Sequence, residues 1–112
     1  MAPQVELLLW SGCPSHERAR AQLSEAMAQA GLEPGAFAEI AVESEEEAKR
    51  ERFIGSPTVR IDGVDAVDPG DREPALTCRL YRRRDGSPSP LPDSEELREA
   101  LARAAGKREE PR

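Results

Sequence analysis

The stretch Trp10-Ser11-Gly12-Cys13-Pro14-Ser15-His16-Glu17-Arg18 joins two different sequence patterns. Before it, residues 5–10 are apolar apart from one glutamate, which is typical of a strand buried on both faces of a sheet. After it, residues 14–30 repeat apolar side chains at spacings of three and four, which predicts a helix. Pro14 suits a first helical position because its missing N–H needs no partner there. The sequence therefore predicts that Cys13 lies between a buried strand and the N-terminus of a helix.

Length, charge and cysteine content restrict the class of protein. A chain of 112 residues is long enough for one modest core, and we expect a domain over residues 1–105 with a flexible tail at 106–112. The net charge of −6 disfavours nucleic acid, which needs a basic face. Two cysteines are too few for a secreted disulfide scaffold, and no signal peptide or membrane span is present in the sequence. We expect a cytoplasmic protein with no nucleic-acid and no membrane partner.

The remainder of the chain alternates between strand and helix patterns. Residues 36–42 alternate apolar and polar side chains, which predicts a second strand. Ser44-Glu45-Glu46-Glu47 is a capping box, which predicts that a short helix follows over 45–53. We expect a third strand up to the turn at Asp62-Gly63 and a fourth, its antiparallel partner, at 75–82. A final helix is expected to begin at Asp93-Ser94-Glu95-Glu96.

A second motif, Gly55-Ser56-Pro57-Thr58-Val59, opens the third strand, where proline must stand first because it cannot donate inside a ladder. Together with the Cys13 motif and the order of elements, it resembles the thioredoxin-like fold over residues 5–105. That resemblance implies an α/β domain with a four-stranded mixed sheet flanked by about three helices. It also implies that Pro57 is cis and packs beside the Cys13 turn.

The resemblance implies a function as well as a fold. Cys13 would be the redox-active cysteine, and Trp10, Ser56, Pro57 and Thr58 would form the substrate-binding surface, with the Ser56 backbone holding an extended partner chain. The expected partner is a protein that bears a thiol or disulfide, or a small thiol, and no cofactor or metal is expected. The family's second cysteine would fall at position 16, where this chain has His16. The resemblance therefore favours single-cysteine, monothiol-type exchange.

The chemistry expected of Cys13 follows from its position. A helix N-terminus favours a thiolate over a thiol, and the thiolate is the nucleophile. His16 lies one helical turn further on, where it would stabilise the thiolate or transfer a proton as a general acid or base. The alternative is that Cys13 is a small buried core residue and that His16 is only a surface residue. We retain Cys13 and His16 as the catalytic candidates.

Two further residues allow alternative interpretations. Trp10 either shields the thiolate from water or fills the edge of the core. Cys78 shares a strand face with Leu76 and Leu80, which favours a buried strand cysteine over a remote resolving or metal-binding thiol. The fourth strand would place Cys78 far from Cys13, so a disulfide between them is disfavoured, since it needs Cα atoms within about 7 Å.

Three functions remain open on the sequence. The first is a thiol-disulfide oxidoreductase that acts through Cys13. The second is a non-catalytic binding module of the same fold. The third is a soft-metal protein that uses Cys13 and His16, although two ligands are too few for a closed structural site.

Overall fold

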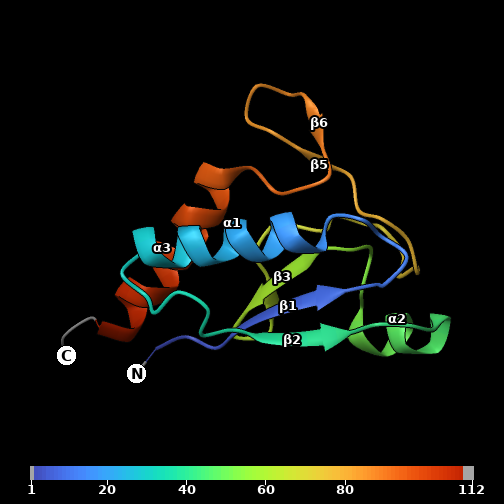
Figure 1. The fold of residues 1–112 in the computed structure, drawn as a ribbon, viewed down its shortest axis with the longest axis horizontal. Coiled ribbons are helices and arrows are strands. Elements are labelled where there is room, and N and C mark those ends of the chain that lie inside the picture. Colours follow the sequence, from blue (N-terminus) through green and yellow to red (C-terminus); the bar gives the residue numbers. More distant parts are fainter. Residues whose placement is uncertain (1, 110–112) are drawn as a thin grey trace.

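The computed structural model describes residues 2–109 and the side chains of residues 2–106. Its centre is a four-stranded mixed sheet with the order β2-β1-β3-β4 (Figure 1). These strands are β1 (Val5–Leu9), β2 (Ala38–Ala41), β3 (Thr58–Ile61) and β4 (Val64–Asp65). β1 pairs in parallel with β2 and antiparallel with β3, and β3 pairs antiparallel with β4. With three helices, this confirms the expected α/β architecture at the level of its elements.

Helices pack against both faces of the sheet. The helices α1 (His16–Gln29) and α3 (Ser94–Glu109) lie on one face, and the short α2 (Glu45–Glu51) lies toward the other (Figure 1). Side chains from α1, α3, β1 and β3 form the larger core, in which Leu7, Leu23 and Leu101 are fully buried. The opposite face carries a smaller cluster around Leu8 and Phe53. Buried side chains on both faces explain why β1 is almost continuously apolar.

The expected fourth strand is wrong. The antiparallel partner of β3 is β4, which follows directly after the Asp62-Gly63 turn within the segment expected to be a loop. Of residues 75–82, only Tyr81–Arg82 form a strand, β5, which pairs with β6 (Pro88–Ser89) in a separate hairpin. The alternation of apolar residues at 76, 78 and 80 was misleading because Leu80 is exposed rather than packed against the sheet.

The ends of two helices also differ from expectation. α1 begins at His16, with Ser15 as its N-cap, so Pro14 lies in the preceding turn and is not the first helical residue. Cys13 therefore lies one short turn before the helix and not directly at its end. α3 is capped by Asp93, whose carboxylate accepts from the backbone N–H groups of Glu95 and Glu96. It continues to residue 109, so residues 106–109 are helical, and residues 110–112 of the expected tail lie outside the described residues.

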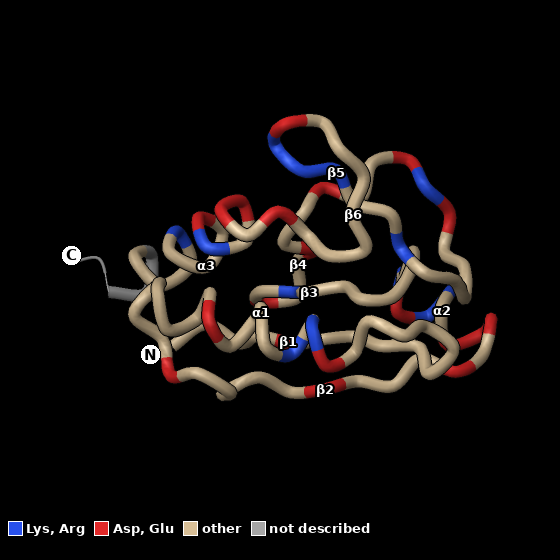
Figure 2. The backbone as a smooth tube through the Cα atoms, turned by 45° about the horizontal axis from the view of Figure 1, so that its top comes forward, with Lys and Arg blue, Asp and Glu red and all other residues tan. Residues whose placement is uncertain are grey.

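Lys and Arg residues are interspersed with Asp and Glu residues over the chain (Figure 2). The run Arg82-Arg83-Arg84 lies at the β5–β6 hairpin. Arg84 forms ion pairs with Asp93, Glu95 and Glu99 of the α3 region, so part of this basic run is already paired. Between residues 2 and 109, no helix is long and apolar enough to cross a membrane.

Candidate functional site

The register of β1 and β3 brings the two sequence motifs together. Leu8 pairs with Thr58, so the C-terminal end of β1 lies beside the start of β3. The backbone N–H of Trp10 donates to Ser56 Oγ at 3.1 Å, and that of Cys13 donates to the Trp10 carbonyl at 3.1 Å. These two bonds fix the turn that carries Cys13 against the loop before β3.

The Ser56–Pro57 peptide bond is cis, which confirms this part of the expectation. Cys13 lies against this bond, because its Sγ donates to the Ser56 carbonyl at 3.5 Å. The side chain of Cys13 is 5% exposed, and Ser56 is completely buried. Only a small part of the Cys13 side chain is therefore accessible from the surface.

Gly12 allows this turn to be compact. A Cβ at position 12 would lie 2.4 Å from the Trp10 ring, closer than atoms can approach. The indole thus packs over the backbone of Gly12, one residue before Cys13, and is only partly exposed. This position agrees with either of the roles considered for Trp10, a shield for the sulfur or a cover for the core edge, where it contacts the cluster around Leu8.

A third segment, which the sequence did not single out, completes the site. Residues 77–79 run beside Ser56 as an isolated parallel β-bridge centred on Cys78. The Ser56 N–H donates to the Thr77 carbonyl, and the Arg79 N–H donates to the Ser56 carbonyl, both at 2.8 Å. The Ser56 backbone groups that the resemblance assigned to a partner chain are therefore already paired within this chain. Ser56, Pro57 and Thr58 are also all buried, so they offer little surface to a substrate.

Gly55 makes this close approach possible. Its φ of +147° is a conformation that L side chains rarely adopt, and a Cβ there would lie 2.8 Å from the Arg79 backbone. A glycine before the Ser56–Pro57 bond is thus required for the third segment to lie at this distance. The glycine itself is the sequence signal that a close backbone approach occurs here.

The placement of Cys78 is the main correction to the sequence analysis. Cys78 is exposed, not buried, and it is not remote from Cys13. Its thiol interacts directly with the Cys13 sulfur, and this hydrogen bond, with burial and the charge of Cys13 contributing less, raises the pKa of Cys78 to about 11. Both thiols are free. The expectation failed because it assumed a regular fourth strand running away from the site.

Arg79 anchors the Cys78 segment. Its guanidinium donates to Asp65 Oδ2 at 2.8 Å, to Thr58 Oγ1 at 3.1 Å and to the Val67 carbonyl at 3.0 Å. It also lies 4.5 Å from the centre of the Tyr81 ring, a cation–π distance. Because the Arg79 side chain is only 1% exposed, the ion pair with Asp65 is shielded from solvent. These contacts hold the residue next to Cys78 against β3 and β4.

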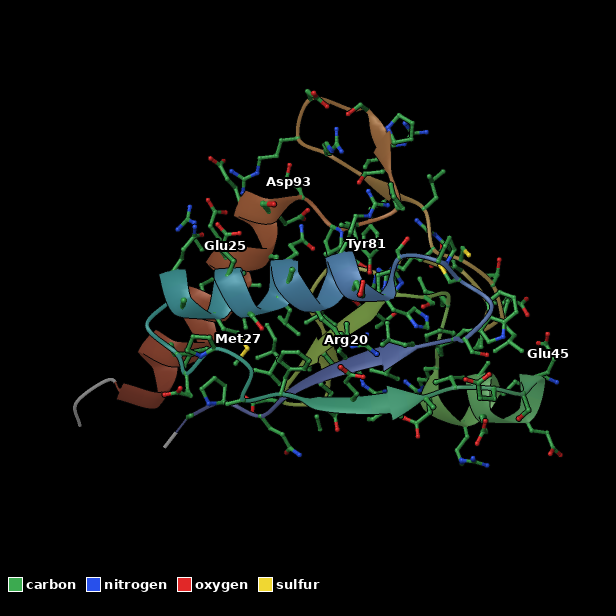
Figure 3. The ribbon with its side chains drawn as sticks, in the orientation of Figure 1. Arg20, Glu25, Met27, Glu45, Tyr81 and Asp93 are labelled. Carbon is green, nitrogen blue, oxygen red and sulfur yellow. The ribbon has the colours of Figure 1, made fainter. Side chains whose placement is uncertain are left out.

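Tyr81 holds the same segment from its other side. Its hydroxyl donates to the Pro57 carbonyl at 2.5 Å, and its ring is buried. Burial raises the pKa of Tyr81, since a phenolate there would lose its hydration. Figure 3 shows Tyr81 pointing from the hairpin strand β5 into the body of the domain. Arg79 and Tyr81 thus fix both Cys78 and the Pro57 loop, a role that their alternation in the sequence did not reveal.

His16 contacts the turn and not the thiol. Its Nε2 donates to the Trp10 carbonyl at 2.7 Å, the same oxygen that accepts from the Cys13 N–H. This is the only side-chain hydrogen bond of His16 among the described residues. The geometry gives His16 a positioning role for the Cys13 turn, whereas proton transfer to or from Cys13 stays a prediction.

The described part of the chain contains no group of three or more His, Cys, Asp or Glu residues that is placed to hold a metal ion.

A cavity of about 530 Å³ lies on the α2 side of the sheet, between Leu8, Thr58 and Asp65, and neither cysteine lines it. A smaller cavity of about 250 Å³ adjoins His16 and the Arg20–Glu39 ion pair. In this ion pair Arg20 comes from α1 (Figure 3), and Glu39 comes from the exposed strand β2.

No protein-family model, curated protein or solved structure matches this chain. The chemistry of the site is therefore the basis for a proposal about function.

Proposed function

We propose that this chain is a thioredoxin-like protein that carries out thiol-disulfide exchange through Cys13. The observation that supports this most directly is the contact of Cys13 Sγ with the carbonyl of Ser56, at a cis proline bond and one turn before a helix. A thiol in such a turn benefits from the positive end of the helix dipole when it ionises. A cytoplasmic, reducing compartment would keep Cys13 reduced, so that its thiolate is available for attack.

The exchange begins with nucleophilic attack. The Cys13 thiolate attacks one sulfur of a disulfide, a mixed disulfide forms between Cys13 and that sulfur, and the other sulfur leaves as a thiolate that takes up a proton. The substrate is a protein disulfide or a small disulfide. His16, by its bond to the Trp10 carbonyl, would hold the Cys13 turn in position for this step.

The burial of Cys13 favours a second candidate. A thiol that is 5% exposed is also what a non-catalytic module with a packed cysteine would have. In that case the fold would serve to bind a partner protein and Cys13 would only fill space.

One measurement separates the two functions. In a Cys78→Ser variant, which retains a single cysteine, the rate at which oxidised glutathione modifies Cys13 at pH 7 is followed by intact-mass spectrometry. The matched control is the same variant unfolded in urea. Exchange predicts that the folded protein reacts about tenfold faster or more, because the fold supplies thiolate. A folded protein that reacts more slowly than the unfolded chain would favour the binding module.

A further inference from the structure

We propose that Cys13 and Cys78 form one dithiol that closes an intramolecular disulfide across the Ser56–Pro57 loop, with Cys78 in the resolving role that position 16 cannot fill. This inference rests on the proposed function and adds the second half of its reaction. It replaces monothiol exchange, in which an outside thiol must release the substrate, with exchange completed within the chain.

The backbone geometry brings the two thiols together. The backbone hydrogen bonds that Thr77 and Arg79 form with Ser56 place Cys78 directly opposite Ser56. Cys13 Sγ donates a hydrogen bond to the carbonyl of that same Ser56. The thiol of Cys78 interacts directly with the Cys13 sulfur. Both cysteines thus adjoin Ser56, Cys13 through its side chain and Cys78 through a backbone bridge, and a disulfide requires such closely spaced residues.

The structure makes the two thiols unequal. The interaction with Cys13 keeps the proton on Cys78, so Cys78 is not the attacking nucleophile while Cys13 is reduced. Once Cys13 is bonded to a substrate sulfur, its thiol no longer takes part in that hydrogen bond. The cause that held the proton on Cys78 is then gone, and Cys78 becomes free to ionise. Attack by Cys13 thereby activates the thiol that resolves it.

The two steps balance. In the first, Cys13 and a substrate disulfide give a Cys13 mixed disulfide and one released substrate thiol. In the second, Cys78 attacks Cys13 Sγ, the bond between Cys13 and the substrate breaks, and the second substrate thiol leaves. The substrate disulfide gains two electrons and two protons and becomes two thiols. The protein dithiol loses the same two electrons and two protons and becomes a disulfide.

The anchoring of Cys78 is consistent with this role. Arg79, the next residue, is held by a buried ion pair to Asp65 and by Thr58. An exposed cysteine that served no purpose at the site would need no such fixation. The exposure of Cys78 also allows a released substrate to leave and a reductant to reach the disulfide.

The test uses the full-length reduced protein and oxidised glutathione as the disulfide probe. Wild type, Cys78→Ser and Cys13→Ala are sampled over time after acid quenching, and adducts are assigned by intact-mass and peptide mass spectrometry. Leu80→Ser serves as the matched control, because Leu80 lies two residues from Cys78 and is 54% exposed. Circular dichroism establishes that each variant is folded.

We expect wild type and Leu80→Ser to lose two hydrogens as monomers with Cys13 linked to Cys78. We expect Cys78→Ser to accumulate the Cys13 glutathione adduct at a level about tenfold or more above that of wild type. If wild type accumulates that adduct as strongly as Cys78→Ser does, the intramolecular disulfide is refuted while the proposed function stands. If no variant forms an adduct on Cys13, both are refuted. Dimers linked through Cys78, in place of a bond within one chain, would also overturn the proposal.

Discussion

The two cysteine segments of this protein are held in opposite ways. Cys13 lies in a compact turn between β1 and α1, where the chain returns on itself and the thiol is buried. Cys78 lies in an irregular segment between β4 and β5, and its thiol is exposed. The first segment is fixed by regular structure on both sides. The second is fixed by Ser56, to which its backbone is bonded, and by the Arg79 side chain.

The comparison shows that the Cys78 segment can be held beside Cys13 without belonging to a helix or a strand. A single β-bridge to Ser56 and the buried Arg79 hold the Cys78 segment, whereas a strand and a helix flank Cys13. Cys13 is buried and Cys78 is exposed. Removing the support from one segment at a time should therefore give distinct results.

The largest effect is expected from Arg79→Ala, which removes the support of the Cys78 segment. The buried ion pair with Asp65 breaks, and we expect the free energy of unfolding to fall by about 3–5 kcal/mol. Urea denaturation measures this loss. A double-mutant cycle with Asp65→Ala is the control, since a real pair requires that the two losses are not additive. A loss below about 1 kcal/mol would show that the anchor is not needed.

A matched pair of glycine substitutions compares the two segments directly. Gly55→Ala forces an unfavourable φ and a backbone clash with Arg79, so we expect a loss of about 3 kcal/mol or more. Gly12→Ala meets only the Trp10 side chain, which can turn away, so we expect about 1–2 kcal/mol. Gly106→Ala in α3, where a Cβ meets nothing, is the control and should be neutral or slightly stabilising. Equal losses at positions 12 and 55 would contradict the contrast drawn here.

The ionisation of Cys78 reports on the contact between the segments. In wild type its alkylation should rise with pH around a pKa of about 11. In Cys13→Ala the cause of the raised pKa is absent, so the midpoint should fall toward the ordinary thiol value of about 8.5. Because the pKa is raised in the folded state, its contribution to stability is complete below the unfolded value and is lost as pH rises through about 11. An unchanged midpoint in Cys13→Ala would show that the thiols do not interact.

The smallest effect is expected at His16. His16→Ala removes one hydrogen bond to the Trp10 carbonyl, which should cost about 1 kcal/mol and slow the reaction of Cys13 with oxidised glutathione. His16→Gln retains a donor of similar reach but no titratable ring. Rescue of the rate by glutamine would assign His16 a positioning role. A rate that stays as low with glutamine as with alanine would instead support proton transfer by the imidazole.

The sequence predicted the first segment well and the second poorly, for a physical reason. Residues around Cys13 carry local signals, since an apolar run, a glycine, a proline and a helical repeat each act within a few positions. The motif around Pro57 was likewise readable, and its proximity to Cys13 was implied by the resemblance to the thioredoxin-like fold. The Cys78 segment depends instead on contacts with Ser56, Asp65 and Thr58, which are distant in sequence.

Alternation at positions 76, 78 and 80 imitated a buried strand face, but Cys78 and Leu80 are exposed while Arg79 between them is buried. The functional meaning of Arg79 was hidden for a related reason. A charged residue in an alternating pattern normally faces solvent, whereas here it is buried by a partner, Asp65, on β4. In the sequence, only Gly55 indicated that another part of the backbone lies close to the Ser56–Pro57 loop.

The bridge between Ser56 and residues 77–79 has a consequence for how the domain meets other chains. A segment tethered within the same molecule competes with any outside strand at an effective concentration on the order of millimolar. The apparent affinity of a partner that pairs with Ser56 is reduced by the small fraction of molecules in which the segment is open. Backbone pairing alone is therefore a poor basis for association. Under the proposed function, discrimination among partners would then depend on whether they bring a sulfur that Cys13 can attack.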